Sequence, residues 1–366
     1  MDAFRYSAKT TTPISYKTRW QAPSNIALIK YWGKEKNQIP KNPSLSFTLQ
    51  KCVTETSIEF QPKPTSGLTF DFFFEGKPNP NFLPKLNHFF DQIRPYVSWL
   101  DGYHLTITSD NSFPHSSGIA SSASAMAALA LGVMDAEREM DAGITDTLFT
   151  TKASFLARLG SGSAARSVEG PITVWGKTPS VKEASNDFAC KIDSLHTVFT
   201  AYQDTVLIVE KGSKSVSSSQ GHALMNGHPF ANQRFEQAQQ HLHSLLEVMQ
   251  EGNLDDFIRI VESEALTLHA MMMTSQPYYL LMEPQTLSII QKVWAFRKET
   301  HLPLCFTLDA GANIHLLYPK EHVAPILDFI KNELSPYCQQ GYYIEDEVGR
   351  GAKKCTFDCY EQYSFP

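Results

Sequence analysis

The spacing of apolar residues along the chain predicts a mixture of strands and helices. Segments that alternate apolar and polar residues, or that are apolar between turn residues, are typical of strands. We expect strands through Ile26 and Leu28 and over residues 51–60, 68–74, 104–110, 168–175, 197–202, 205–210, 305–309, 315–318 and 341–348. Apolar residues three and four apart predict helices at about 79–100, 119–138, 145–160, 229–251, 253–273, 283–300 and 321–335. This order is typical of two successive α+β units.

The length of the chain favours two lobes, because a single hydrophobic core seldom grows beyond about 250 to 300 residues and this chain has 366. The polar stretch 178–196 marks the expected junction. We therefore expect an N-terminal lobe over 20–190 and a C-terminal lobe over 191–366. Residues 1–19 are polar and rich in threonine, which predicts a loose extension, with ordered structure from about Trp20.

Charge and cysteine content narrow the range of partners. The formal net charge of -6 gives no general attraction to nucleic acid or anionic lipid, so any phosphate must be bound by local groups. The six cysteines form no Cys-x-x-Cys pair, so we expect neither a disulfide scaffold nor a zinc site. No stretch approaches the ~18 continuous apolar residues of a membrane span, and residues 1–10 contain no apolar signal core. We expect a cytoplasmic protein that binds neither membranes nor nucleic acid.

In the segment 114–130, a turn of small residues runs into an alanine-rich helix. The first turn of a helix presents unpaired backbone N–H groups and the positive end of the helix dipole, so it attracts phosphate. Gly118 would let the backbone approach a ligand, and the hydroxyls of Ser121 and Ser122 could contact phosphate oxygens or magnesium. No Gly-Lys-Ser/Thr sequence occurs in this segment, which excludes a Walker-type loop there. The alternative is a core helix that binds nothing.

Two other segments place cations and hydroxyls beside small residues. The first strand ends in Lys30 and is followed by Lys34, so two ammonium groups would point into a cleft. The turn at 160–167 follows a helix and presents Ser161 and Arg166, whose guanidinium suits bidentate binding of carboxylate or phosphate. The alternatives are solvated lysines at a strand end and a helix C-cap followed by a surface arginine.

A carboxylate and a polar loop complete the candidate chemistry. Asp309 ends an apolar strand and precedes small residues, where it can approach a reacting hydroxyl, and nearby lysine and arginine would keep it ionised. A turn-forming aspartate close to a glycine is the alternative. The polar loop 211–221 follows a buried strand, and it either lines the same cleft or forms an ordinary surface loop.

Five segments carry a resemblance to a known family. They are Ile29-Lys-Tyr-Trp-Gly-Lys34, Pro114-His-Ser-Ser-Gly-Ile-Ala-Ser-Ser-Ala123, Gly160-Ser-Gly-Ser-Ala-Ala-Arg166, Val216-Ser-Ser-Ser-Gln-Gly221 and Asp309-Ala-Gly-Ala-Asn313. Together they resemble diphosphomevalonate decarboxylases, a branch of the galactokinase, homoserine kinase, mevalonate kinase and phosphomevalonate kinase superfamily. The resemblance spans about 20–350. It implies a two-lobed α+β fold with a ribosomal S5 domain 2-like N-terminal lobe, a ferredoxin-like C-terminal lobe and an active site in the cleft between them.

The activity that the resemblance implies is the ATP-dependent conversion of mevalonate 5-diphosphate to isopentenyl diphosphate, carbon dioxide, ADP and phosphate. ATP would be the co-substrate, Mg²⁺ the metal, and the protein a homodimer. Asp309 would orient or deprotonate the carbon-3 hydroxyl, and Lys30 would bridge that hydroxyl and the γ-phosphate. Arg166, helped by Asn25, would hold the substrate carboxylate.

The resemblance also implies contacts to the two phosphorylated groups. The diphosphate tail would be bound by Tyr31, Lys34, Ser161 and Arg166. The residues implied to bind ATP are Pro114, Ser117, Gly118, Ala120, Ser121, Ser122 and Ser124. Of these, Ser122 would contact the magnesium ion.

The sequence departs from the family pattern at three places. Ala312 replaces a usual proline, 115–117 reads His-Ser-Ser where many members have threonine and alanines, and the N-terminal extension matches no segment of the family. The methionine-rich segment 269–282 aligns with a segment near the substrate cleft and belongs either to the cleft or to a core or lid. Alternative functions are a kinase or decarboxylase of the same superfamily that acts on another phosphorylated mevalonate, and a non-catalytic ATP-binding protein.

Overall fold

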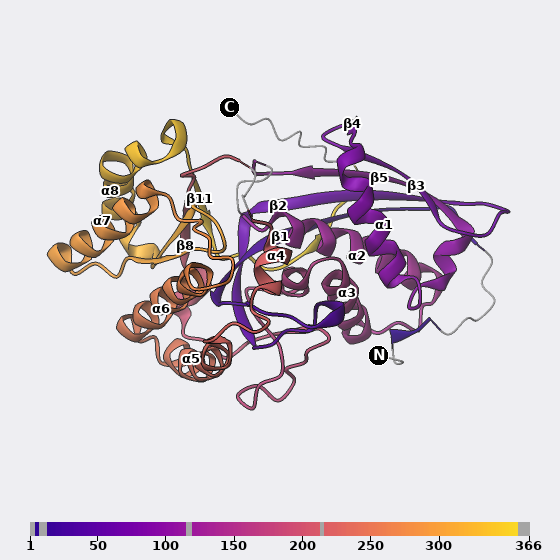
Figure 1. The fold of residues 1–366 in the computed structure, drawn as a ribbon. Coiled ribbons are helices and arrows are strands. Elements are labelled where there is room, and N and C mark those ends of the chain that lie inside the picture. The colour runs from indigo at the N-terminus through magenta and orange to yellow at the C-terminus, as the bar shows by residue number, and fades with distance from the viewer. Residues whose placement is uncertain (1–3, 7–12, 115–118, 213–215, 358–366) are drawn as a thin grey trace.

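The computed structural model describes residues 4–6, 13–114, 119–212 and 216–357 and contains two β-sheets with helices on their faces (Figure 1). Within this part of the chain, the first sheet has eight strands and the second has four. Helices from the N-terminal half lie along the first sheet, and most helices from the C-terminal half lie beside the second. The fold is therefore the two-lobed α+β fold that the sequence predicts.

The first sheet forms most of the N-terminal lobe. Its strands are β1 (Tyr16–Ile29), β2 (Ser44–Pro62), β3 (Thr69–Phe74), β4 (Lys77–Pro78), β5 (Tyr103–Asn111), β6 (Ile172–Trp175), β7 (Ala189–Lys191) and β12 (Lys353–Lys354). Their order is β12-β1-β2-β5-β3-β4, and β6 pairs with both β2 and β7. These pairs are antiparallel except for β3 with β5. The long strand β2 holds the sheet together, since it pairs with β1, β5 and β6.

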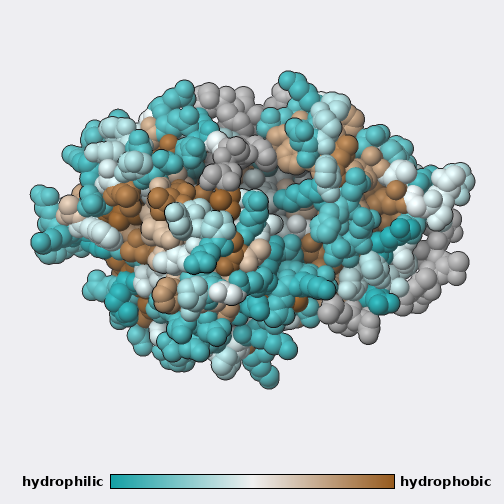
Figure 2. Space-filling model, in the orientation of Figure 1, coloured by the Kyte–Doolittle hydropathy of each residue, from teal (hydrophilic) through white to brown (hydrophobic). Residues whose placement is uncertain are grey.

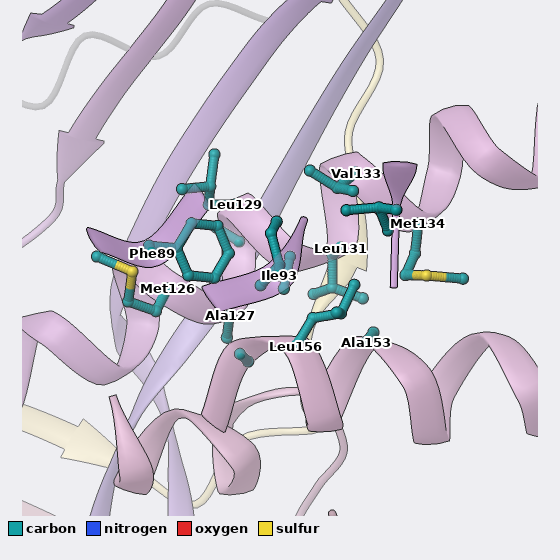
Figure 3. Packing of buried hydrophobic residues seen from close by; sticks show 14 of the residues in the cluster. Phe89, Ile93, Met126, Ala127, Leu129, Leu131, Val133, Met134, Ala153 and Leu156 are labelled. Carbon is teal, nitrogen blue, oxygen red and sulfur yellow. The ribbon is translucent and has the colours of Figure 1, made fainter. Parts of the chain in front are cut away.

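Three helices bury apolar residues beside this sheet. They are α1 (Leu83–Ile93), α2 (Ser121–Met140) and α3 (Asp146–Gly160). Figure 3 shows Phe89 and Ile93 of α1 packed in one cluster with Met126 of α2. The alanine-rich α2 lies very close to the strands, because a Cβ atom added at Gly132 would come within 2.6 Å of the Ile58 side chain. Small residues in α2 thus fix the distance between helix and sheet.

The second sheet and its helices form the C-terminal lobe. Its strand order is β11-β8-β10-β9. The strands are β8 (Gln203–Leu207), β9 (Cys305–Thr307), β10 (Ile314–Tyr318) and β11 (Tyr343–Glu347). The helices are α4 (Ser218–Ala223), α5 (Ala231–Glu251), α6 (Leu254–Met273), α7 (Pro284–Thr300) and α8 (Val323–Phe329), which continues into a π-helical turn (Ile330–Leu334). As predicted, β9 and β10 form an antiparallel hairpin.

One hydrophobic cluster continues from one lobe into the other. Leu28 of β1 and Phe47 of β2 belong to the same buried group as Val206 of β8, Leu242 of α5 and Phe257 of α6. Burial of this apolar surface stabilises the joined lobes, at roughly 25 cal/mol per Å² removed from water. The two lobes therefore share a core across their interface.

A carboxylate also joins the two sheets. Asp346 of β11 accepts hydrogen bonds from the backbone N–H groups of Gln50, Lys51 and Cys52, at 3.0, 2.8 and 2.7 Å. These amides lie where β2 bulges away from β1, between the partners of Pro23 and Asn25, so strand pairing with β1 does not satisfy them. Asp346 supplies the acceptors that the bulge needs.

The expected loose extension over 1–19 needs correction. Strand β1 begins at Tyr16 rather than near Trp20, and Phe4 is buried, with its ring 4.7 Å from that of Phe155. Thr18, one of the polar residues of this stretch, has an internal partner, since its hydroxyl donates to the carboxylate of Asp135 in α2.

Three further expectations about elements are corrected. The segment 197–202 is a 3-10 helix over Thr197–Ala201, started by the His196 side chain, which accepts from the Val198 N–H at 3.2 Å. The expected helix over 79–100 is helical in α1 only over Leu83–Ile93, with short 3-10 turns before and after it. The chain also returns to the first sheet as β12, which pairs with β1, so the C-terminal half contributes to the N-terminal lobe. The boundary near residue 190 stays a prediction.

Candidate active site

A cavity of about 500 Å³ lies between the lobes, and each of the five segments that carry the family resemblance contributes to its wall. The predicted residues on this wall are Lys30, Tyr31, Lys34, Ala120, Ser121, Ser122, Ser161, Arg166 and Asp309. Residues Ser217, Ser218 and Ser219 at the start of α4 also line it, so the loop 211–221 reaches the cleft. Hydroxyls and cations dominate a space of the size that small ligands occupy.

An ion pair connects the two lobes inside this cavity. Lys30 directly follows β1, Asp309 lies just after β9, and the Lys30 Nζ atom is 2.8 Å from Asp309 Oδ1. The lysine side chain is 1% exposed, whereas the aspartate side chain is 33% exposed. Burial lowers the pKa of Lys30, and the nearby carboxylate of Asp309 opposes this shift. A carboxylate that faces the cavity is thereby fixed by a buried ammonium group.

The backbone of Lys30 is held by a buried carboxylate behind the cavity. Glu264 of α6 accepts from the Lys30 backbone N–H at 2.9 Å and from Arg234 of α5 through both guanidinium nitrogens, at 2.9 and 2.5 Å. His241 contacts the same carboxylate at 2.7 Å. Burial by itself would raise the pKa of Glu264, but Arg234, His241 and the Lys30 amide outweigh it and hold that pKa below its usual value. Helices α5 and α6 therefore position the end of β1.

Arg166 presents a buried cation to the same cavity. Its guanidinium donates to the Ser44 hydroxyl and, at 3.4 Å, to the Asn25 side-chain oxygen, while Nε has no hydrogen-bond partner among the described residues. Burial lowers the pKa of Arg166 to about 10, although Asp309 and Tyr31 oppose the shift. The group therefore stays protonated near neutral pH, and an anion would stabilise it.

Lys34 and Tyr31 form a second polar region of the wall. The Lys34 Nζ atom donates to Gln38 at 2.8 Å, and burial lowers the pKa of Lys34. The Tyr31 ring packs against Trp175 at 4.7 Å between ring centroids, and its hydroxyl has no hydrogen-bond partner among the described residues. Lys34 is thus held by a neighbour on the cavity wall, and Tyr31 by the packing of its ring.

The start of α2 faces the cavity without a side-chain cap. Ala120 precedes the helix in a left-handed conformation, with φ 39°, and forms no side-chain cap with the described residues of the first turn. Ser122 lies 3.2 Å from Ser161, hydroxyl to hydroxyl, which brings the helix start next to the 160–167 turn. First-turn amides and hydroxyls at one place have the chemistry that suits phosphate oxygens.

A second cavity of about 290 Å³ adjoins the first and shares Lys85, Ser121 and Ser122 with it. Its other walls are largely apolar and aromatic. They include Phe72, Phe74, Phe82, Leu86, Met126 and Leu129, with Asn81, Ser109 and Asn111 as polar groups. An aromatic cavity beside the start of α2, where phosphate is expected to bind, is suited to a planar ring.

Comparison with known proteins agrees with this geometry. The model of the diphosphomevalonate decarboxylase-like N-terminal domain matches residues 22–187, and the model of the mevalonate 5-diphosphate decarboxylase C-terminal domain matches residues 205–361. The chain belongs to the diphosphomevalonate decarboxylase family. Both lobes of the fold, and the cavity between them, fall within the matched residues.

Relatives within the diphosphomevalonate decarboxylase family align over most of the chain. A diphosphomevalonate decarboxylase of Saccharomyces cerevisiae is 28% identical over 336 residues, which are 86% of this chain and 81% of the relative. A phosphomevalonate decarboxylase of Haloferax volcanii is 25% identical over 305 residues, 81% of this chain and 86% of the relative. The crystal structure of mevalonate diphosphate decarboxylase from Staphylococcus aureus superposes with a TM-score of 0.81 at 27% identity, covering 94% of this chain and 99% of that one. A structure described as MDDEF in complex with MVAPP, AMPPCP and magnesium gives 0.79 at 26% identity, with 93% and 99% covered.

Two residues expected to touch ligands in this family lie away from the cavity surface. Asn25 is 3% exposed and is not part of the wall; its amide donates to Ser167 at 2.7 Å while its oxygen accepts from Arg166. Ser124 is fully buried, and its hydroxyl lies 2.6 Å from that of Thr54 in β2. Asn25 thus contacts Arg166, and Ser124 joins α2 to the sheet, while their expected contacts to ligands stay predictions.

Only part of the loop expected to bind the nucleotide in this diphosphomevalonate decarboxylase fold lies within the described residues. Ser117 and Gly118 lie outside the described residues, and Pro114 is described but is not part of the cavity wall. The methionine-rich segment contributes Met271 and Met272 to a buried cluster with Trp32, which is a core position.

Sequence reasoning missed several residues that the structure places at this family's site. His222 and Lys85 line the cavity, and Glu264 and Arg234 hold the end of β1. Lys85 lies in a helix whose sequence pattern indicates a hydrophobic face and nothing more. Glu264 lies in a helical segment whose neighbouring residues give no sign of a functional group. The Gly-His pair after the serine-rich loop was the one signal that could have indicated His222.

Proposed function

We propose that this protein converts mevalonate 5-diphosphate and ATP to isopentenyl diphosphate, carbon dioxide, ADP and phosphate. The observation that carries the proposal is the Lys30–Asp309 pair, 2.8 Å apart, in one cavity with Arg166 and the uncapped start of α2. A carboxylate beside an ammonium suits activation of a hydroxyl, and the helix start suits a phosphate donor.

In the first step, the carbon-3 hydroxyl of the substrate attacks the γ-phosphorus of ATP. Asp309 accepts the hydroxyl proton, the new O–P bond forms, and the bond to the β–γ bridging oxygen breaks to release ADP. Lys30 offsets the negative charge on the transferring group. Such reactions depend on positioning and charge compensation more than on covalent help from the protein.

In the second step, the carbon-3 phosphate leaves and the carboxylate is lost as carbon dioxide. The electrons of the breaking carbon–carbon bond form the alkene as the carbon–oxygen bond to phosphate breaks. Arg166 holds the carboxylate before it leaves, and Asn25 fixes Arg166 through the 3.4 Å contact. The guanidinium suits this role because its planar fork matches a carboxylate.

The phosphorylated groups bind on either side of the reacting carbon. Tyr31, Lys34 and Ser161 bind the diphosphate tail. The first-turn amides and hydroxyls of Ser121 and Ser122 bind the ATP phosphates, together with the nearby loop that contains Pro114, Ser117 and Gly118. The adjoining aromatic cavity takes the adenine ring.

The residues present fit a magnesium ion held mainly by phosphate. No group of three or more His, Cys, Asp or Glu side chains suited to a metal occurs within the described residues, and the serine hydroxyls at the start of α2 are oxygen donors of the kind magnesium accepts. Ser122 would contribute to such a site. Bound with ATP, magnesium would neutralise charge on the transferring phosphates.

A single assay tests the proposed reaction. The protein is incubated with ATP, magnesium and mevalonate 5-diphosphate, and carbon dioxide, isopentenyl diphosphate and ADP are quantified. We expect all three in equal amounts. ADP without carbon dioxide would instead identify a kinase, and intact ATP binding without ATP consumption on either mevalonate 5-diphosphate or mevalonate 5-phosphate would identify a non-catalytic protein.

Decarboxylation of mevalonate 5-phosphate is the second candidate, because one relative is a phosphomevalonate decarboxylase. The position of Lys34 and Tyr31 beside the cavity favours the diphosphate, since a second phosphate gives these two donors an additional anion to bind. Comparing kcat/KM for the two substrates distinguishes the candidates.

A homodimer and a cytoplasmic location complete the proposal. Large apolar side chains are exposed in and near α7, among them Leu280, Leu287 and Trp294, and Figure 2 shows apolar surface on the half of the molecule that α6 and α7 occupy in Figure 1. Analytical ultracentrifugation tests the dimer, and cell fractionation tests the location. No helix in the described ranges has both the length and the apolar character of a membrane span.

A further inference from the structure

His222 of α4 is a buried imidazole on the wall of the catalytic cavity. Its ring packs between Tyr31 and Trp32, with ring centroids 4.2 and 4.6 Å away, and the residue is only 6% exposed. The predicted site does not include this residue, although Tyr31 beside it belongs to the region proposed for the diphosphate tail.

The hydrogen bond at one ring nitrogen fixes the tautomer. The backbone N–H of Gly33 donates to His222 Nδ1 at 2.9 Å, so Nδ1 must be unprotonated. The proton of the neutral ring is then on Nε2, for which the described part of the chain offers no hydrogen-bond partner. The ring therefore carries one donor that remains available to a ligand.

The surroundings keep this ring neutral. Burial lowers the pKa of His222 to about 3, and the positive charges of Lys34 and Arg166 contribute in the same direction. A cationic imidazole would also lose the Gly33 hydrogen bond, since both of its nitrogens would be donors.

From this arrangement, we propose that His222 binds the phosphorylated tail of the substrate as a neutral hydrogen-bond donor through Nε2. The inference rests on the proposed function and adds a specificity-determining residue to it. A neutral donor strengthens binding of a diphosphate without repelling the neighbouring cations Lys34 and Arg166. Its second nitrogen holds Gly33, and so it also orders the loop that carries Tyr31 and Lys34.

Three substitutions separate these two functions of the ring. His222→Asn keeps an acceptor near the position of Nδ1 for the Gly33 amide but removes the Nε2 donor. His222→Gln places an amide donor near the position of Nε2, and His222→Met removes both polar groups at similar volume. His243→Asn, on the exposed side of α5, is the matched control.

We expect His222→Asn to raise the dissociation constant and the KM for mevalonate 5-diphosphate about tenfold, which is the usual effect of losing a hydrogen bond to a charged group. The KM for ATP and the melting temperature should stay close to those of the wild type and of His243→Asn. His222→Gln should recover most of the affinity, and His222→Met should lose at least as much as His222→Asn. Binding is measured by titration calorimetry, which requires no turnover.

Two results would overturn the inference. One is a folded His222→Asn variant that binds mevalonate 5-diphosphate as tightly as the wild type. The other is a ¹⁵N NMR spectrum in which the His222 ring becomes cationic between pH 5 and 8. Failure of the proposed function itself looks different, because the wild type would then neither bind nor decarboxylate mevalonate 5-diphosphate.

Discussion

Asp309 combines exposure to the cavity with a fixed position of its carboxylate. It reaches the solvent-filled space, yet its carboxylate oxygen is fixed 2.8 Å from a buried ammonium group. The chain segment that carries it is also held, because His269 contacts the Asp309 backbone oxygen at 3.1 Å. The carboxylate can therefore meet a substrate hydroxyl with little loss of conformational freedom.

Asp309→Asn tests this role directly. An amide cannot take the hydroxyl proton, so we expect kcat to fall by about 10² to 10⁴ while the dissociation constant for ATP changes little. Single-turnover kinetics and calorimetry measure the two quantities. Asp101→Asn, which alters only a surface ion pair with Arg94, serves as the control. A turnover within tenfold of wild type would remove Asp309 from the proton transfer.

Two serines that lie two residues apart at the start of α2 should respond differently to substitution by alanine. Ser122 lines the cavity, so Ser122→Ala should raise the KM for ATP by roughly 3- to 10-fold, the effect of one lost hydrogen bond. Ser124 is buried against Thr54, so Ser124→Ala should instead lower the free energy of unfolding by about 1 kcal/mol and leave the KM unchanged. Steady-state kinetics and urea unfolding distinguish them. Equal effects on the KM would contradict the proposed placement of the phosphates.

At the scale of elements, helices α5 and α6 act on the site through a carboxylate that lies buried behind the cavity wall. Glu264 and Arg234 are both fully buried. Glu264 accepts from the backbone N–H of Lys30, the residue that directly follows β1, and Arg234 pairs with Glu264. Truncating one partner of such a pair leaves an uncompensated buried charge.

Arg234→Met should therefore lower the free energy of unfolding by about 3 to 5 kcal/mol. The double variant Arg234→Met with Glu264→Gln should recover part of this loss, because it removes the unpaired charge. Chemical unfolding measures both. If Arg234→Met were as stable as the wild type, the pair would not be the element that holds α5, α6 and β1 together.

The pKa of Glu264 also predicts how stability depends on pH. Because its folded value lies below the ordinary 4.5, the carboxylate contributes stability above that pH and loses it as the pH falls through the folded value. The difference in unfolding free energy between wild type and Glu264→Gln should be constant at neutral pH and shrink below about 4.5. A difference that grows on acidification would contradict this assignment.

Elements with strong periodicity were predictable from the sequence, and those set by distant contacts were not. The helix expected over 253–273 is α6 (Leu254–Met273), since its apolar spacing and its Asn253 cap are local signals. The segment 197–202 has strand-like composition, but a local side-chain cap turns it into a 3-10 helix. The strand character of Tyr16 depends on pairing with Phe60, which no local pattern reveals.

At the scale of the whole molecule, the site exists only where the two halves meet. Lys30 and Asp309 are 279 residues apart in the sequence, yet each was recognisable from its position at a strand end and from family resemblance. His222 and Glu264 were missed because their importance comes from packing against β1 and its loop, which the sequence pattern does not record.

The shared core predicts that neither half folds alone. A fragment covering residues 1–190 would expose Leu28 and Phe47 to water, together with the bulged amides that Asp346 satisfies. We expect this fragment to be insoluble or to lack a cooperative transition, whereas the full chain unfolds in one step. Circular dichroism during heating measures both. A fragment with its own sharp transition would show that the lobes are independent domains.

The pairing of β12 with β1 has a consequence for synthesis. Strand β1 begins at Tyr16, but its partners at Trp20 and Gln21 are Lys354 and Lys353, close to the end of the chain. While the ribosome is still making the intervening residues, this edge of the sheet has unpaired backbone groups and can join a strand of another chain. Strand β12 therefore closes this edge of the sheet long after β1 has been translated, and a nascent chain stalled before residue 353 should be prone to aggregation.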